Sequence, residues 1–156
     1  SSSGWIGESI LLAAPVILIT GAGSVFGKML QNSGVGDLVT SNMSDANWGI
    51  FLPFLIAFAL KTAQGSTTVA MITTASIIAP ILGQLGLDSE TMKVFTALAI
   101  GAGSLCISHA NDSGFWVVTQ LSGMSIKQGN MSHSLGTLIA GVTAILLIFV
   151  LTLVVV

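Results

Sequence analysis

The polar run Ser108-His109-Ala110-Asn111-Asp112-Ser113-Gly114 lies between two apolar segments, Leu105-Cys106-Ile107 and Phe115-Trp116-Val117-Val118. An ionisable side chain at bilayer depth costs between about 2.5 and about 17 kcal/mol, so the few that occur there usually mark ion or substrate pathways. If the flanking segments cross a membrane, Asp112 and His109 are therefore the first candidates for a functional site.

The composition of the whole chain is that of a membrane protein. Of its 156 residues, 53% are hydrophobic and 6% are charged, and the mean hydropathy is +0.95. A soluble domain carries about 25% charged residues. Residues 135–156 contain no charge and, at about 1.5 Å per residue, are long enough to cross a hydrocarbon core of about 30 Å. The sequence therefore predicts an all-α integral membrane protein that ends in a transmembrane helix.

The remaining apolar segments are shorter or interrupted. Residues 1–30 are predicted to form a glycine-rich helix packed against protein. Residues 48–85 contain two apolar arms that meet at the polar residues 64–68, and residues 92–121 contain the polar break at 108–114. Backbone outside a helix survives at membrane depth only where protein or water satisfies its polar groups. These patterns predict a re-entrant hairpin with a polar tip, a helix that follows it, and a discontinuous transmembrane helix.

The break also has a purely structural interpretation, in which Asn111 and Asp112 cap a helix that begins near Phe115. This interpretation is compatible with function, because membrane transporters aim the N-termini of discontinuous helices at anionic substrates. Capping residues can therefore also bind a substrate.

Three chemistries are open to His109, Asp112 and Ser113, which would share a face of a continuous helix. An intramembrane hydrolase would use them as a nucleophilic triad, but no nucleophile motif accompanies them. A metal site is disfavoured because the next histidine, His133, lies 24 residues away in a polar loop expected at residues 122–134. A polar substrate or proton site is favoured, because both charged groups and imidazoles can exchange protons along such pathways.

The expected hairpin tip offers an amide, hydroxyl groups and the N-terminus of the next helix, which together can bind a carboxylate or a polyol. Lys61 lies about one turn before Ser66. It is either a source of positive charge for this site or a lysine that snorkels to the membrane interface. The sequence leaves both alternatives open.

Four blocks of sequence closely resemble the C-terminal part of the gluconate permease family, in the family's order and over nearly the whole chain. The most specific block is His-x-Asn-Asp-Ser-Gly-Phe-Trp at residues 109–116. The blocks are Gly21-Ala22-Gly23-Ser24-Val25-Phe26-Gly27-Lys28, Gln31-Asn32-Ser33-Gly34-Val35-Gly36, Ala63-Gln64-Gly65-Ser66-Thr67-Thr68-Val69-Ala70, and Gly101-Ala102-Gly103-Ser104 followed by residues 108–116.

The resemblance implies a multi-pass symporter of the bacterial inner membrane that takes up gluconate, or a related small hydroxy or amino acid, with protons by alternating access. It implies no enzymatic activity and no cofactor other than the coupling proton. It also implies a wider relationship to ion transporters built from two inverted repeats, in which each repeat supplies a polar-tipped hairpin and a broken helix. Residues 1–156 would then form the C-terminal repeat.

The expected partners follow from this relationship. They are a small anionic or zwitterionic substrate, the lipid bilayer and the N-terminal repeat of the same protein, and a homodimer is compatible with it. No nucleic acid is expected, because the chain has no basic cluster. Two other classes remain open: a non-transporting membrane subunit or assembly module, and a pore.

The two polar runs carry the expected site residues. His109 or Asp112 would exchange the coupled proton, and Lys61 is the candidate charge partner of the substrate. No metal ligand is expected. The expected substrate-binding residues are Gln64, Gly65, Ser66, Thr67, Thr68, Ser108, Asn111 and Ser113.

Overall fold

The structure is a computed structural model, and it describes residues 4–11, 14, 18, 25, 29 and 49–155. Every regular element among these residues is helical, so the all-α prediction is confirmed for the described part of the chain. Residues 5–11 are helical. Most of the helix expected at residues 1–30 lies outside the described residues, as do the block at 31–36, Trp48 and Val156.

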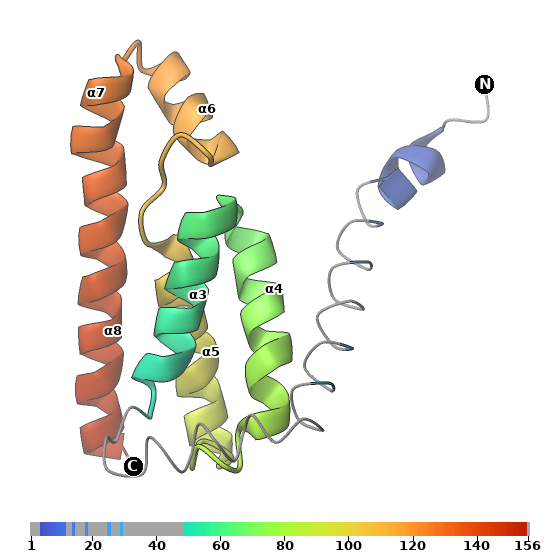
Figure 1. Ribbon diagram of the computed structural model, residues 1–156, viewed down its shortest axis with the longest axis vertical. Helices are drawn as coiled ribbons and strands as arrows, with labels where there is room; N and C mark the ends of the chain where they lie inside the picture. Colours follow the sequence, from blue (N-terminus) through green and yellow to red (C-terminus); the bar gives the residue numbers. More distant parts are fainter. Residues whose placement is uncertain are drawn as a thin grey trace.

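Two short helices form a hairpin (Figure 1). Helix α3 spans Phe51–Gln64, helix α4 spans Thr67–Ile78, and the short 3-10 helix η1 at Ala79–Ile81 follows α4. The first helix ends because Gly65 adopts a left-handed conformation, with a φ of 79°, and its N–H binds the carbonyl oxygen of Lys61 at 2.8 Å. The second begins because Ser66 Oγ accepts a hydrogen bond from the backbone N–H of Val69. Gly65 and Ser66 therefore form the hairpin tip.

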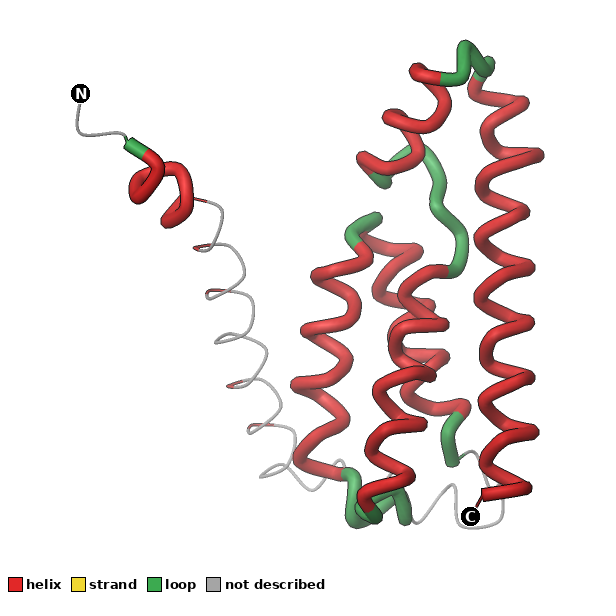
Figure 2. Tube along the Cα trace, turned by 180° about the vertical axis from the view of Figure 1, so that it is seen from behind, coloured by secondary structure: helices red, strands yellow, loops and turns green. Residues whose placement is uncertain are grey.

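The next two helices are separated by a non-helical segment. Helix α5 spans Glu90–Leu105 and helix α6 spans Ser113–Leu121. Residues 106–112, called the interruption below, connect them as the loop visible in Figure 2. The interruption lies two residues earlier than the break expected at 108–114, and Ser113 and Gly114 belong to the first turn of α6. This shift arises because Asp112 is the N-cap of α6, so that the helix begins at Ser113.

The C-terminal helix is longer than the sequence suggested. Helix α7 at Ile126–Gly129, the π-helical turn η2 at Asn130–Ser134 and helix α8 at Leu135–Val155 follow one another without a break. Residues 122–134 were expected to form a polar loop, and this prediction is wrong for 126–134. The reason is a capping box, in which Ser125 and Gln128 bind each other's backbone N–H groups at the start of α7.

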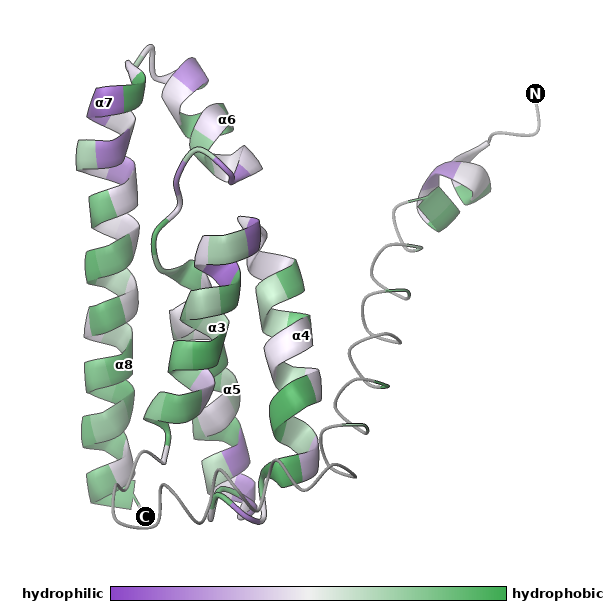
Figure 3. Cartoon of the chain, viewed as in Figure 1, coloured by the Kyte–Doolittle hydropathy of each residue, from purple (hydrophilic) through white to green (hydrophobic). Residues whose placement is uncertain are grey.

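The described residues contain one helix, Ile126–Val155, that is long and apolar enough to cross a membrane by length and composition. Most of the surface of its α8 part is strongly hydrophobic (Figure 3). Large apolar side chains such as Leu147 and Leu153 are 60% and 70% exposed. An exposed apolar surface of this kind is typical of contact with lipid.

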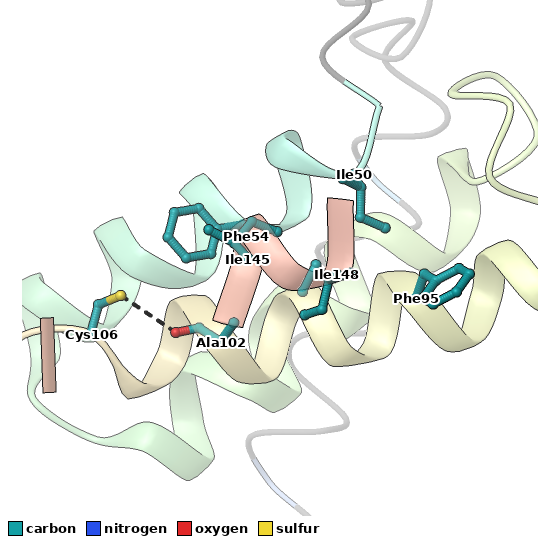
Figure 4. Close-up of a cluster of buried hydrophobic side chains, with 8 residues drawn as sticks. Ile50, Phe54, Phe95, Ala102, Cys106, Ile145 and Ile148 are labelled. Atoms are coloured by element: carbon teal, nitrogen blue, oxygen red, sulfur yellow. Dashed lines mark hydrogen bonds between the residues drawn. The ribbon is translucent and has the colours of Figure 1, made fainter. Parts of the chain in front are cut away.

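Helix α5 lies at the centre of the bundle and contacts α3, α4 and α8. Its buried side chains pack with those of α3 and α8 in the cluster drawn in Figure 4. Cys106 is a buried free thiol, and its Sγ donates to the carbonyl oxygen of Ala102 at 3.4 Å. The cluster consists of Ile50, Phe54, Phe95, Ala99, Ala102, Cys106, Ile145 and Ile148.

Helices α3 and α5 approach each other closely at Gly103, where a Cβ atom would lie 2.2 Å from the carbonyl oxygen of Phe54. We expect Gly103→Ala to force the helices apart and to destabilise the full-length protein by about 1–3 kcal/mol. Thermal unfolding in detergent measures this effect. Gly101→Ala is the matched control, because a Cβ at Gly101 meets no atom within 4 Å. Equal melting temperatures for the two variants would contradict the close packing.

Candidate functional site

The hairpin tip lies directly against the interruption. A Cβ atom on Gly65 would lie 2.2 Å from the carbonyl oxygen of Asn111, so only a glycine fits there without displacement. Two side chains of the interruption reach the last turn of α3: Asn111 Nδ2 donates to the carbonyl oxygen of Thr62 at 2.8 Å, and His109 Nε2 lies 3.3 Å from the same oxygen. The fold thus brings together the two polar runs that the sequence singled out.

A buried ion pair joins these two segments. Lys61 Nζ lies 2.6 Å from Asp112 Oδ2 and also donates to the carbonyl oxygen of Gly65 at 2.7 Å. The Lys61 side chain is 1% exposed and that of Asp112 is 14% exposed. This burial rules out the alternative in which Lys61 snorkels to an interface. The ammonium group also lies at the C-terminal end of α3, where a helix favours positive charge.

Asp112 has three hydrogen-bond donors around its carboxylate. Oδ1 accepts from the backbone N–H of Gly114 at 2.9 Å, and Oδ2 accepts from Ser108 Oγ as well as from Lys61. Asp112 is therefore the N-cap of α6, which begins at Ser113 rather than near Phe115 as expected. Asn111 was expected to share the capping role, but its side chain binds α3 instead.

The C-terminal helix satisfies the backbone of the interruption. Thr137 Oγ1 accepts from the N–H of Ser108 at 3.0 Å, and Ser134 Oγ donates to the carbonyl oxygen of Ser108. Trp116 Nε1 donates to the carbonyl oxygen of Ala110 at 2.8 Å. Non-helical backbone inside a membrane needs such protein partners. None of these three side chains was expected from the sequence, although hydroxyls at 134 and 137, three residues apart at the start of an apolar helix, are a usable signal.

The other predicted substrate-binding residues lie around this contact. Gln64 and Thr68 are exposed on either side of the hairpin tip, and Ser113 is exposed in the first turn of α6. Thr67 is partly buried in the first turn of α4, and Ser66 caps that helix. Both segments thus carry polar side chains within a few residues of the hairpin tip and of Asp112 along the chain.

The N-termini of two helices lie beside the same contact. Helix α4 begins two residues after Gly65, and helix α6 begins two residues after Asn111. A helix N-terminus carries partial positive charge and N–H groups that suit an anion. The arrangement can therefore hold a carboxylate, with hydroxyl and amide side chains available for the rest of a polar molecule.

The geometry disfavours the hydrolase and metal alternatives. His109 and Asp112 lie in non-helical backbone, so they do not share a helix face with Ser113. The imidazole Nε2 faces the Thr62 carbonyl, whereas the carboxylate binds Lys61, Ser108 and Gly114. Within the residues that the structure describes, no group of three or more His, Cys, Asp or Glu side chains could hold a metal ion.

Comparison with known proteins agrees with the resemblance seen in the sequence. The family described as GntP family permease matches residues 3–154. The inner membrane permease YgbN of Escherichia coli is 40% identical over 144 residues, covering 91% of this chain and 31% of that protein. The gluconate permease of Pseudomonas aeruginosa is 38% identical over 149 residues, covering 94% and 32%.

A third relative, the high-affinity gluconate transporter of Escherichia coli, is 36% identical over 129 residues, covering 82% of this chain and 28% of that protein. The chain thus spans about a third of the length of the curated relatives that it matches. No solved structure matches it. The extent of the family match and the identity to these permeases show that the chain belongs to the GntP permease family.

Proposed function

We propose that this chain is the C-terminal repeat of a multi-pass secondary transporter of the bacterial inner membrane. The transporter takes up gluconate, or a related small hydroxy or amino acid, together with protons by alternating access. The names of the relatives support this proposal, since they include gluconate permeases and a high-affinity gluconate transporter.

The observation that carries the proposal is the contact between the hairpin tip and the interruption, with the Lys61–Asp112 pair buried beneath it. A sugar acid combines one carboxylate with several hydroxyls. The carboxylate would bind at Lys61 and the N-termini of α4 and α6. Its hydroxyls would bind the polar groups that border the tip, which are Gln64, Ser66, Thr67, Thr68, Ser108, Asn111 and Ser113.

In this proposal the α3–α4 hairpin is re-entrant and α5 and α6 are the halves of one discontinuous transmembrane helix. Helix α3 has 14 residues and α4 has 12, whereas a transmembrane helix needs about 20. Each helix is therefore too short to cross a membrane, and the hairpin that they form is suited to entering the membrane partway and returning to the same side. A second repeat of inverted topology would face this one and complete the substrate site.

The test is uptake of labelled gluconate by the full-length permease in liposomes with an acidic exterior. We expect saturable accumulation above the external concentration, and its loss when a protonophore collapses the pH gradient. Empty liposomes are the control. Absence of uptake together with a partner that co-purifies in fixed ratio would identify a non-transporting subunit, and conductance without saturation would identify a pore.

A further inference from the structure

We infer that the substrate carboxylate and Asp112 compete for the Lys61 ammonium, and that Asp112 takes up the coupled proton when the substrate replaces it. The inference rests on the proposed function and adds the step that ties one proton to one substrate anion.

The hydrogen-bond donors of Lys61 limit how many acceptors it can bind. An ammonium group has three N–H donors. Asp112 Oδ2 and the carbonyl oxygen of Gly65 use two of them, at 2.6 and 2.7 Å. One donor then remains for a substrate oxygen, so a carboxylate that binds Lys61 through both of its oxygens must displace either the Gly65 carbonyl or Asp112, and only Asp112 carries the same charge as the substrate.

The charge balance of the buried site requires a proton when a second carboxylate binds. The Lys61–Asp112 pair is neutral, and its lysine is 1% exposed. A second carboxylate at Lys61 would leave an uncompensated negative charge in this buried site, which is strongly unfavourable. Protonation of Asp112 restores neutrality. One proton thus enters with each carboxylate, and it leaves on the inner side when Lys61 binds the ionised Asp112 again.

The surroundings of Asp112 accommodate its neutral form. Ser108 Oγ donates to Oδ2 in the ionised state, and a serine hydroxyl can rotate to accept the proton of a carboxylic acid instead. The N–H of Gly114 continues to donate to Oδ1. Because Thr137 and Ser134 hold the Ser108 backbone, this switch needs only a hydroxyl rotation.

The titratable groups around Asp112 favour it over His109 as the proton carrier. Among the residues that the structure describes near Asp112, the titratable groups are Lys61 on α3 and His109 in the interruption. Helices α4 and α6 carry no ionisable side chain, and His133 of η2 lies against Phe115. His109 Nε2 faces the Thr62 carbonyl, so protonating the imidazole would not release Lys61.

The experiment is isothermal titration calorimetry of the purified full-length permease with gluconate, in buffers that differ in ionisation enthalpy. This comparison counts the protons taken up on binding. We expect one proton per gluconate, and an affinity that falls about ten-fold for each unit of rising pH while Asp112 is ionised in the free protein.

Three variants identify the residue that takes up the proton. Asp112→Asn should bind gluconate without proton uptake and with an affinity that does not depend on pH, whereas His109→Gln should still take up one proton. Asp88→Asn is the matched control, because Asp88 is exposed and lies just before α5, at the opposite end of that helix from the interruption. One proton per gluconate in Asp112→Asn, or none in His109→Gln, would overturn the inference.

Infrared difference spectroscopy provides a second measurement that needs no variant of the ion pair. Binding of gluconate to the wild-type protein should produce the C=O signal of a newly protonated side-chain carboxyl group. Binding without this signal, or without proton uptake, overturns the inference alone. Failure of the wild-type protein to bind or accumulate gluconate would instead count against the proposed function.

Discussion

Replacement of Lys61 by methionine should abolish gluconate uptake and destabilise the full-length protein by about 3–5 kcal/mol. Methionine is of similar length but removes the charge, and it leaves the carboxylate of Asp112, 14% exposed, without its cation. Thermal unfolding in detergent measures the stability, and liposome uptake measures the transport. The destabilisation follows from an unpaired buried charge, and the loss of uptake follows from the missing site for the substrate carboxylate.

The chain offers a matched control for this change. Lys93 likewise forms an ion pair, with its Nζ 2.7 Å from the carboxylate of Glu90, but the side chains of Lys93 and Glu90 are 46% and 93% exposed. Because water screens such a pair, Lys93→Met should leave both the melting temperature and uptake nearly unchanged. Similar effects of the two methionine substitutions would contradict the special role of the buried pair.

A double variant separates folding from binding. Lys61→Met combined with Asp112→Asn removes both charges, and replacing a whole buried pair is often nearly neutral for stability. We expect this variant to regain much of the lost stability and to remain unable to take up gluconate. Recovery of uptake would show that Lys61 acts only in folding.

Gly65→Ala should separate the hairpin tip from the interruption and eliminate most of the uptake. The added Cβ would lie 2.2 Å from the carbonyl oxygen of Asn111, and the φ of 79° is unfavourable for any side chain. The conformational part alone is about 1–2 kcal/mol. The displaced backbone should make the total destabilisation larger than this, as measured by thermal unfolding.

Gly86→Ala isolates the conformational part of that destabilisation. Gly86 also has a positive φ, of 68°, but a Cβ there meets no atom within 4 Å. It should therefore show only the conformational destabilisation and retain transport. Equal losses in the two variants would mean that the contact with Asn111 does not matter for the site.

Local interactions set the ends of the helices around the site. The glycine at 65 and the serine at 66 end one helix and begin the next through interactions within a few residues, and Asp112 caps α6 in the same way. The capping box at Ser125 and Gln128 is equally local. It was overlooked because the polar composition of residues 122–134 favoured a loop.

The partners of these groups could not be derived from the sequence. Lys61 and Asp112 are 51 positions apart, and Ser108 and Thr137 are 29 apart. Helical periodicity reports which residues share a face, but not which faces meet. For this reason the sequence could not exclude an interfacial position for Lys61, which its burial excludes.

The amino-acid sequence by itself determined the membrane class, the helical fold, the family and the position of both polar runs, because composition, capping and motif are properties of short stretches of chain. The tertiary structure alone decided that the two runs meet, that Lys61 neutralises Asp112, and that Ser134 and Thr137 satisfy the interrupted backbone. The physical reason is that a buried charge or a freed backbone group must find its partner wherever packing brings one within hydrogen-bonding distance.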